Sequence, residues 1–540
     1  MMKVAYVVTL CCVGWVSKPG NALAGQPVVI RGPYLQLGTP RSITVRWRTD
    51  LSVEGRVRYG LSPVDLTHEE RSATPTVEHE VHLGNLEPAT KYYYAIGTSA
   101  VDLQGGDESH FFVTSPEVGT VVPTRIWVLG DSGTANARAR SMRDAYYAFT
   151  GDTHTDLWLM LGDNAYPVGA DEEYQRAVFD MFPQMLRKSV LWPTLGNHDG
   201  YSANSQRQEG PYYDIFSLPT KAESGGVASG TEAYYSFDYG NIHFICLESF
   251  EMDRSTDSPM LTWLAVDLAA TTQQWIIAYW HHPPYSKASH DSDREIELIE
   301  MRENALPILE DGGVDLVLCG HSHAYERTYL LSGHYGPSYT LRKEMILDCG
   351  DGRSDGHGAY EKPVVRRVEE GAVYIEAGNS GGQGFSRYAL DHPAMVWNSE
   401  DVGSLVIDVD GSRLDVRYLS SQEEVVDYFS IVKEGLTREP MTCSPVAEVP
   451  FRRGDVNGDG KINLSDPIWI VSALFFGASF GPCRAAADVD DDGKLVLTDA
   501  IYTLNFLFRG GPAPPAPYPG CGEDPTDGDP ACTEPWHCRP

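Results

Sequence analysis

Residues 317–323 read Val317-Leu318-Cys319-Gly320-His321-Ser322-His323. The apolar run at 314–318 predicts a buried strand, and the glycine ends it. Neutral imidazole binds zinc, iron or manganese. His321 and His323 are too close along the chain to bind one metal comfortably, but they can serve two adjacent metals. One His-x-His pair is a weak indicator by itself, because a surface pair is at least as common.

Four further apolar runs end in a glycine or a turn and then in metal-binding residue types. They are 126–129 before Asp131, 157–161 before Asp163 and Tyr166, 190–195 before Asn197 and His198, and 275–280 before His281 and His282. In α/β sheets, ligands bind outside the carboxyl ends of the strands. A single Gly-Asp pair is usually only a turn. Five such ends in order favour one shared metal site.

The ordered motifs D-x-G, G-D-x-x-Y, G-N-H-D, H-x-P-x-Y and G-H-x-H resemble those of the purple acid phosphatases within the dinuclear metallophosphoesterases. The resemblance covers roughly residues 124–435 and implies an α/β catalytic domain, a sandwich of β-sheets flanked by helices. One position departs. Ala278 stands where the fourth motif of the family, V-x-x-H, has valine; we expect a packing residue there, so the ligand assignments stand.

The resemblance implies two metals that share one carboxylate. The first would be held by Asp131, Asp163, Tyr166 and His323, and the second by Asp163, Asn197, His281 and His321. Two metals about 3.5–4 Å apart clamp both oxygens of an in-line displacement, and a metal-bound hydroxide would attack phosphorus. The phenolate of Tyr166 favours iron(III), and the second metal would be divalent zinc, manganese or iron.

The resemblance also implies catalytic roles. His198 would contact the phosphate or protonate the leaving alkoxide, and Asp199 would orient His198. His290 is similar to a family position that contacts the phosphate. His282 is expected beside the ligands rather than among them.

The predicted function is a secreted acid phosphatase that hydrolyses phosphate monoesters. A phosphodiesterase or another phosphoester hydrolase on the same scaffold is the alternative, because the motifs do not separate the two. A binding module with a dead site is disfavoured, since a lapsed site would be expected to lose at least one ligand.

Length and charge limit the partners. The chain has 540 residues, a 42% hydrophobic fraction and a net charge of −33. This length predicts several domains. The negative charge argues against nucleic acid and anionic membranes as partners, so phosphate esters must be attracted locally, by metal ions.

Residues 1–24 predict an export signal. Lys3 precedes an apolar core at 4–16, and Ala22-Leu23-Ala24 is a small-x-small cleavage site. Cys11 and Cys12 would leave with it, and no lipidation is predicted. We expect a secreted, cell-surface or periplasmic protein without another membrane segment; an uncleaved anchor is the alternative.

Eight cysteines remain after the signal, an even number that permits disulfides in an exported chain. Cys246 and Cys319 lie in predicted core strands and are expected as buried thiols. The other six are Cys349, Cys443, Cys483, Cys521, Cys532 and Cys538.

Residues 26–116 alternate as strands do, with Ile43, Val45 and Trp47 on one face. Residues 86–94 predict a turn that enters a strand, with a tyrosine corner. The region is similar to the fibronectin-III-like β-sandwich that precedes the catalytic domain in plant-type purple acid phosphatases. His79 and His82 are expected as strand or surface residues. A linker follows at 117–124.

The region 124–435 also predicts helices at 172–182, 261–268 and 294–309, and Pro307 is a candidate to break the last one. Strands at 404–409 and 413–419 flank Asp410-Gly411, a hairpin signal. Residues 331–365 are glycine-rich and predict an inserted loop near the site.

After a linker at 437–452, residues 453–510 contain a repeat in which Asp455 to Lys461 is echoed by Asp488 to Lys494. Carboxylates or an amide at loop positions 1, 3 and 5, glycine at 6 and a carboxylate at 12 match calcium loops of the EF-hand kind. This small α-helical repeat resembles a type I dockerin, which implies a cohesin-type protein partner. Val496 at position 9 weakens the second loop. A Pro/Gly/Cys-rich tail at 511–540 is expected to be irregular. The predicted calcium residues are Asp455, Asn457, Asp459, Lys461, Asn463, Asp466, Asp488, Asp490, Asp492, Lys494 and Asp499.

Overall fold

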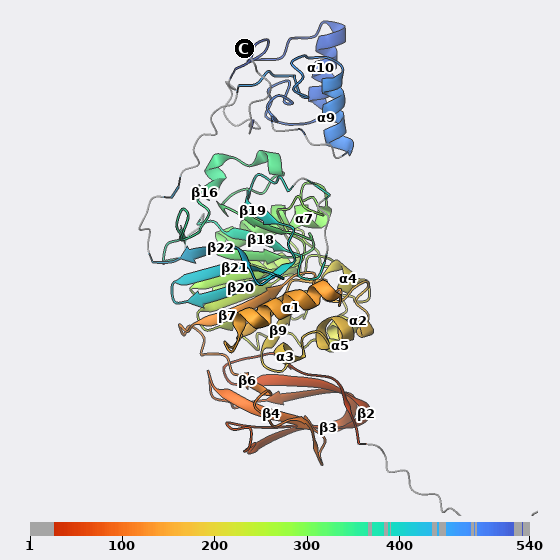
Figure 1. Ribbon diagram of the computed structural model, residues 1–540, viewed down its shortest axis with the longest axis vertical. Coiled ribbons are helices and arrows are strands. Elements are labelled where there is room, and N and C mark those ends of the chain that lie inside the picture. The colour runs from red at the N-terminus through yellow and green to blue at the C-terminus, as the bar shows by residue number, and fades with distance from the viewer. Residues whose placement is uncertain are drawn as a thin grey trace, which may run out of the picture.

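The computed structural model describes residues 26–365, 370–382, 387–388, 390–434, 440–441, 450–476, 480, 483–522 and 532. The predicted export signal and Cys443 and Cys538 lie outside these residues. Three parts follow one another along the long axis: a β-sandwich-like N-terminal domain, a central α/β domain and a small helical C-terminal unit (Figure 1).

The N-terminal domain is antiparallel and has an aromatic core. Its strands are β1 (Val29–Gln36), β2 (Ile43–Gly60), β3 (His68–Leu83), β4 (Lys91–Gly97), β5 (Asp102–Gly105) and β6 (Phe111–Val113). Ile43, Val45 and Trp47 are buried together, as the alternation predicts. The Tyr92 hydroxyl accepts a hydrogen bond from Glu87 N (3.0 Å), which closes the predicted turn. His79 is a strand residue stacked on Trp47, with ring centroids 4.6 Å apart.

Two sheets form the middle of the central domain. The first runs β17 (Tyr360–Glu361), β22 (Val425–Val432), β21 (Arg413–Ser420), β20 (Gly403–Asp410), β7 (Thr124–Leu129), β8 (Leu157–Met160) and β9 (Val190–Pro193). The second runs β10 (Tyr235–Tyr239), β11 (Ile242–Cys246), β12 (Trp275–Tyr279), β13 (Leu316–Cys319), β18 (Val373–Ala377), β14 (Tyr325–Thr328) and β19 (Met395–Ser399).

Apolar side chains between the two sheets make the main core. Trp192 of the first sheet stacks on Phe237 of the second, with ring centroids 3.8 Å apart. Helix α1 (Ala137–Thr150) lies outside the first sheet (Figure 1), and α6 (Pro259–Ala270) and α8 (Leu306–Asp311) pack on a second apolar cluster outside the other sheet. This burial of strands on both faces explains their near-continuous apolar sequences.

Two predicted helices are divided by wider π turns. The helix predicted at 172–182 is α2 (Asp171–Tyr174) followed by η1 (Gln175–Phe179), and α3 (Pro183–Leu186) begins after it. The helix predicted at 294–309 is α7 (Ile296–Glu300), η2 (Met301–Ala305) and α8. Pro307 therefore does not break it. The π turn widens the helix just before the proline, and the missing N–H falls in the first turn of α8.

The predicted hairpin is formed by β20 and β21, and Gly411 takes the positive φ of 58° that the turn requires. The segment predicted as an inserted loop contains only short elements: β15 (Leu330–Leu331), η3 (Ser338–Thr340), η4 (Lys343–Met345), β16 (Ile346–Asp348) and β17. It packs beside the fourth motif, because the Tyr285 hydroxyl donates to the carbonyl of His334.

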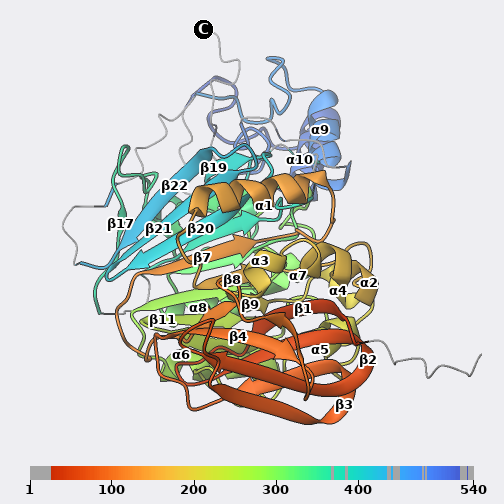
Figure 2. The same cartoon turned by 60° about the horizontal axis from the view of Figure 1, so that its bottom comes forward.

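The N-terminal domain is joined to the first sheet. Strand β1 pairs with β9 in parallel at Leu35 and Val190, so one sheet runs through both domains (Figure 2). Arg31 and Arg48 both form ion pairs with Asp171 at the start of α2, at 2.9 Å and 2.6 Å. These contacts hold the N-terminal domain against strand β9 and the segment that follows β8.

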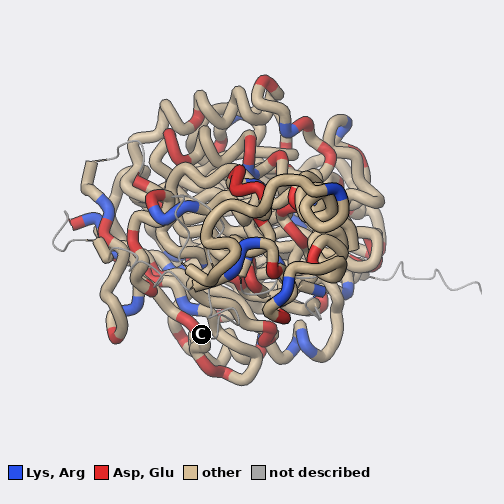
Figure 3. The backbone as a smooth tube through the Cα atoms, turned by 90° about the horizontal axis from the view of Figure 1, so that it is seen from above, with Lys and Arg blue, Asp and Glu red and all other residues tan. Residues whose placement is uncertain are grey.

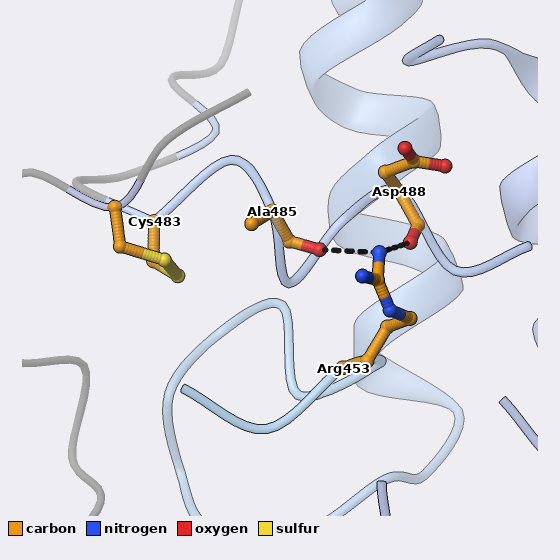
Figure 4. The surroundings of a disulfide bond; sticks show 5 residues. Arg453, Cys483, Ala485 and Asp488 are labelled. Carbon is orange, nitrogen blue, oxygen red and sulfur yellow. Dashed lines mark hydrogen bonds between the residues drawn. A yellow bond between two sulfur atoms is a disulfide. The ribbon is translucent and has the colours of Figure 1, made fainter. Parts of the chain in front are cut away.

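The C-terminal unit contains α9 (Ser465–Phe476) and α10 (Leu497–Arg509). Arg453 lies buried between its two halves and donates to the carbonyls of Asp488 (2.7 Å) and Ala485 (3.5 Å), next to the disulfide Cys483–Cys532 (Figure 4). Cys349 and Cys521 are disulfide-bonded as well. Cys246 and Cys319 are buried free thiols, as predicted. Within the described ranges, no helix is both long and apolar enough to span a bilayer.

Candidate metal centre

The predicted ligands lie at the carboxyl ends of strands from both sheets. Asp131 and Asp163 follow β7 and β8, and His281 and His321 follow β12 and β13. Asn197 begins the short helix α4 (Asn197–Gly200) after β9. The two sheets therefore bring the five sequence motifs to one place.

Three of these residues have strained backbones. Asp131, Asp163 and His321 have positive φ angles of 54°, 52° and 76°. Non-glycine residues adopt this region at a cost, and such strain gathers at functional sites. Gly162 shows how tightly the loops meet, because a Cβ there would lie 2.5 Å from His281 Nδ1.

The first half of the cluster surrounds Asp131, which is fully buried. Its Oδ1 accepts a hydrogen bond from the Tyr166 hydroxyl (2.8 Å) and lies 3.4 Å from His323 Nε2. Its Oδ2 accepts from the backbone N–H of His321 (2.7 Å). Asp131, Tyr166 and His323 therefore present one phenol, one carboxylate and one imidazole to the same point.

The second half surrounds the side chain of Asn197. Its Oδ1 lies 3.1 Å from His281 Nε2 and 3.0 Å from His321 Nδ1. Asp163 Oδ1 lies 3.4 Å from the same nitrogen of His281. His281 Nδ1 donates to the carbonyl of Leu161 (2.9 Å), so in the neutral ring the lone pair that can bind a metal lies on Nε2.

Burial and neighbouring charges shift the pKa values of the cluster. Burial lowers the pKa of His321 to about 3, so its imidazole is neutral, which is the form that binds metals. Burial raises the pKa of Asp163, and burial together with Asp131 raises that of Tyr166 well above its usual value. Burial alone would also raise the pKa of Asp131, but the hydrogen bond to His323 and the charge of His281 bring it down to about 2.

His198 lies at the edge of this cluster with about a third of its side chain exposed, and its Nε2 is 3.9 Å from Asp163 Oδ2. Its Nδ1 must donate to the carbonyl of Pro167 (2.7 Å), because a carbonyl can only accept. Nε2 therefore faces the cluster and is free to take or give a proton.

Within the described part of the chain, no hydrogen bond joins the Asp199 carboxylate to the His198 side chain, which it was predicted to orient. Its Oδ1 accepts from the Tyr174 hydroxyl (2.6 Å), and its Oδ2 accepts from the N–H groups of Gly196 (2.9 Å) and Asn164 (3.1 Å). The carboxylate thus binds the loop after β8 to the loop after β9. The orienting contact of His198 comes instead from a backbone carbonyl, which no side-chain motif reveals.

His290 and His282 both lie against the ring of His321. His290 stacks on it with ring centroids 3.8 Å apart, and its Nδ1 pairs with the Glu295 carboxylate at 2.8 Å. His282 lies 4.3 Å from the same ring, and its Nδ1 hydrogen-bonds Ser249 Oγ (2.9 Å). Glu295, also 3.5 Å from His321 Nε2, was missed because no metal-ligand spacing marks it in the sequence.

The two C-terminal loops have the same internal bonds. Asp455 accepts from Gly460 N and Asp488 from Gly493 N, both at 2.9 Å. Asp466 and Asp499, at position 12, accept backbone N–H groups from the start of their own loops, at 2.9 and 2.8 Å. Asp488, Asp490 and Asp492 bring their oxygens within 4.8 Å of one another. Burial raises the pKa of Asp499 to about 7 and that of Asp466 to about 6.

The chain is similar to two families along its length. Residues 124–325 match the calcineurin-like phosphoesterases, and residues 30–114 match the N-terminal domain of purple acid phosphatase. Purple acid phosphatase 23 of Arabidopsis thaliana is 28% identical over 390 residues, 61% of this chain and 82% of that protein. Phosphoenolpyruvate phosphatase of Allium cepa is 25% identical over 424 residues, 71% and 81% of the two chains.

Solved structures show the same fold. A purple acid phosphatase from yellow lupin (Lupinus luteus) seeds superposes with a TM-score of 0.54 and 18% identity, over 76% of this chain and 74% of that one. PhoD also superposes with a TM-score of 0.54, at 14% identity, over 74% and 88% of the two chains.

Proposed function

We propose that this phosphoric monoester hydrolase is a member of the purple acid phosphatase family, a secreted acid phosphatase with an iron(III)–divalent metal centre. One observation carries the proposal: oxygen and nitrogen donors from five separated motifs meet at buried Asp131 and Asp163. Such a set of carboxylates, imidazoles, an amide and a phenol fits a pair of oxidised or divalent transition metals.

The proposed ligands divide into two groups. Asp131, Tyr166 and His323 form one, and Asn197, His281 and His321 form the other, with Asp163 between them. A carboxylate in this position can offset the repulsion between two cations. The metals, when bound, supply Lewis acidity and activate water for in-line displacement at phosphorus.

The chain's own residues orient the ester and move the proton. We infer that His198 Nε2 gives a proton to the leaving alkoxide, because Nδ1 is committed to the carbonyl of Pro167. His290, held by Glu295 beside His321, would donate a hydrogen bond to the phosphate. Asp199 would act through the two loops it joins rather than on the substrate.

The metal identity can be tested on the purified full-length chain. Iron bound by tyrosinate should give a broad visible band that Tyr166→Phe loses and Tyr201→Phe, an exposed neighbour of His198, retains. Metal analysis and p-nitrophenyl phosphate turnover across pH would accompany the spectra. If the protein is colourless, active and free of iron, the metals at the site are zinc or manganese instead. Faster turnover of bis(p-nitrophenyl) phosphate would favour the phosphodiesterase alternative.

The C-terminal unit supports a second proposal. We infer that its loops bind calcium and that the unit is a dockerin-like attachment module for a cohesin-type partner. We also propose that the N-terminal domain, residues 26–116, is fibronectin-III-like. The observation in favour is the clustering of Asp488, Asp490 and Asp492 in a loop whose backbone already turns around the oxygens. Calorimetry with and without calcium, on wild type and Asp488→Ala, tests it. No calcium-dependent transition in the wild type would end this proposal.

A further inference from the structure

A cavity lies between the central domain and the C-terminal unit. Its volume is about 400 Å³. On one side it is lined by residues of the segments 287–294 and 387–391, and on the other by Leu474 of α9 and by Phe480, Arg484 and Leu495. Arg294 Nη2 also donates to the carbonyl of Ala473 (3.3 Å), so the two parts are in direct contact at its edge. Figure 1 shows the C-terminal unit, with α9, above the end of the central domain where α7 and β19 are labelled.

The cavity adjoins the metal centre through both segments. His290, which stacks on His321, lies between Lys287 and Asp291 of the cavity wall, and Asp291 N donates to the same Glu295 carboxylate that holds the His290 ring. Ser289 Oγ accepts from the backbone N–H of His323 (2.8 Å). The backbone N–H groups of Arg387 and Tyr388 both donate to the carbonyl of Ala288 (2.9 and 3.1 Å). The segment 287–294 therefore carries His290 beside His321 and also lines this cavity.

The charges of the wall favour an anion. Lys287 and Arg294 are balanced by Asp291 and Asp293, which lie 3.0 to 3.1 Å from them. Arg387 and Arg484 line the cavity from the central domain and the C-terminal unit, and Asp391 lines it too; within the described part of the chain no ion pair joins either arginine to a carboxylate. The chain as a whole carries a net charge of −33, and acidic residues are spread over this end of it (Figure 3). The lining thus holds four basic and three acidic side chains, and the planar forks of Arg387 and Arg484 match phosphate or carboxylate oxygens.

The rest of the wall favours a ring. Tyr339 and Tyr388 line the cavity from the central domain, and Leu474, Phe480 and Leu495 line it from the C-terminal unit. Apolar and aromatic walls with a few convergent charges are typical of sites for small organic ligands. A cavity of this volume holds a bicyclic ring with a sugar.

We propose that this cavity binds the leaving-group side of phosphate monoesters that carry a ring and a second anionic group, with Arg387 and Arg484 on the second anion. The inference rests on the proposed phosphatase function, and it makes the C-terminal unit one wall of the substrate site. The hydrolysis itself is unchanged: water adds to phosphorus, the P–O bond of the ester breaks, and the alkoxide leaves with a proton.

Two nucleotides isolate the second anion, because adenosine 5′-monophosphate and adenosine 3′,5′-bisphosphate share the ring and differ by one phosphate. In the full-length chain, Arg484→Ala should lower kcat/KM for the bisphosphate by about tenfold, as expected for a lost charge-assisted hydrogen bond. It should leave turnover of adenosine 5′-monophosphate and p-nitrophenyl phosphate within about twofold. Arg387→Ala tests the opposite wall in the same way. Arg509→Ala, an exposed arginine of α10 outside the cavity, should change none of them.

Binding provides a readout that does not need turnover. The Kd of adenosine 3′,5′-bisphosphate, measured by calorimetry, should rise about tenfold in Arg484→Ala and recover in part in Arg484→Lys. Equal effects on all three compounds, or no effect of either arginine, would overturn the inference. Absence of p-nitrophenyl phosphate turnover in the wild type would instead contradict the proposed function, and the binding measurement would still decide whether the cavity holds the second phosphate.

Discussion

The ring of His198 is oriented by a backbone carbonyl, and this hydrogen bond places a proton on Nδ1. With Nδ1 committed to Pro167, only Nε2 can exchange a proton with a substrate. His198→Ala should therefore retain both metals and lose turnover by about 10²–10⁴-fold, the usual contribution of general acid catalysis. Metal analysis and p-nitrophenyl phosphate kinetics measure the two effects separately. The exposed His357 provides the control, since His357→Ala should change neither. Loss of metal in His198→Ala would show that His198 is a metal ligand instead.

The structural role of Asp199 could not be predicted from the sequence. Its carboxylate accepts from Tyr174, Gly196 and Asn164 and is fully buried. Asp199→Ala leaves these buried donors without an acceptor, so we expect the free energy of unfolding to fall by at least about 3 kcal/mol. Chemical denaturation measures it, with the exposed Asp257→Ala as control. Unchanged stability with reduced turnover would restore the orienting role that the motif predicts.

At the scale of single elements, apolar patterns located the strands well because both faces of each sheet are covered. The runs at 126–129, 157–161 and 275–280 coincide with β7, β8 and β12. The helices were less predictable, since a π turn depends on tertiary packing rather than on residue preference. The seven residues that the family resemblance implies as ligands could be named from the sequence, whereas Glu295 and the carbonyl of Pro167 reach the site only through folding.

His243 joins strand β11 to its neighbours through ion pairs inside the core. Its ring on β11 lies 2.8 Å from both Asp238 on β10 and Asp267 on α6, and it is fully buried. Burial alone would lower its pKa, but these two carboxylates raise it from 6.5 to about 9. The folded pKa is the higher one, so the charged ring stabilises the fold fully below about pH 6.5, and this contribution is lost as pH rises through 9.

The stabilisation of the core by His243 should therefore decrease as the pH rises. We expect His243→Gln to lower the thermal midpoint of the central domain strongly at pH 6 and much less at pH 9.5. Scanning calorimetry of both proteins at the two pH values checks this. His82→Gln, a substitution of an exposed histidine of β3, should give the same small difference at both. A His243→Gln effect that grew with pH would show that the ring is neutral in the folded protein.

On the scale of the whole molecule, the cavity between the central domain and the C-terminal unit could not be foreseen from sequence. Its wall comes from segments around residues 290, 390 and 480, which no local pattern relates. The sequence predicted that the C-terminal unit is an attachment module with no part in catalysis. In the structure, Arg294 donates to the carbonyl of Ala473, and Arg484 lines the cavity between the unit and the central domain.

The two proposals for the C-terminal unit meet in one measurement. If calcium orders the loops that begin at Asp455 and Asp488, it also orders the wall that carries Arg484 and Leu495, because Arg453 bonds the second loop to the first through the carbonyl of Asp488 (2.7 Å). Calcium chelation should then lower kcat/KM for adenosine 3′,5′-bisphosphate by about tenfold, the value expected from losing Arg484, and leave p-nitrophenyl phosphate turnover within about twofold. Asp488→Ala should reproduce the effect without chelator, and exposed Asp152→Ala should not. Equal losses for both substrates would mean that the chelator had stripped the catalytic metals instead, which metal analysis would show directly.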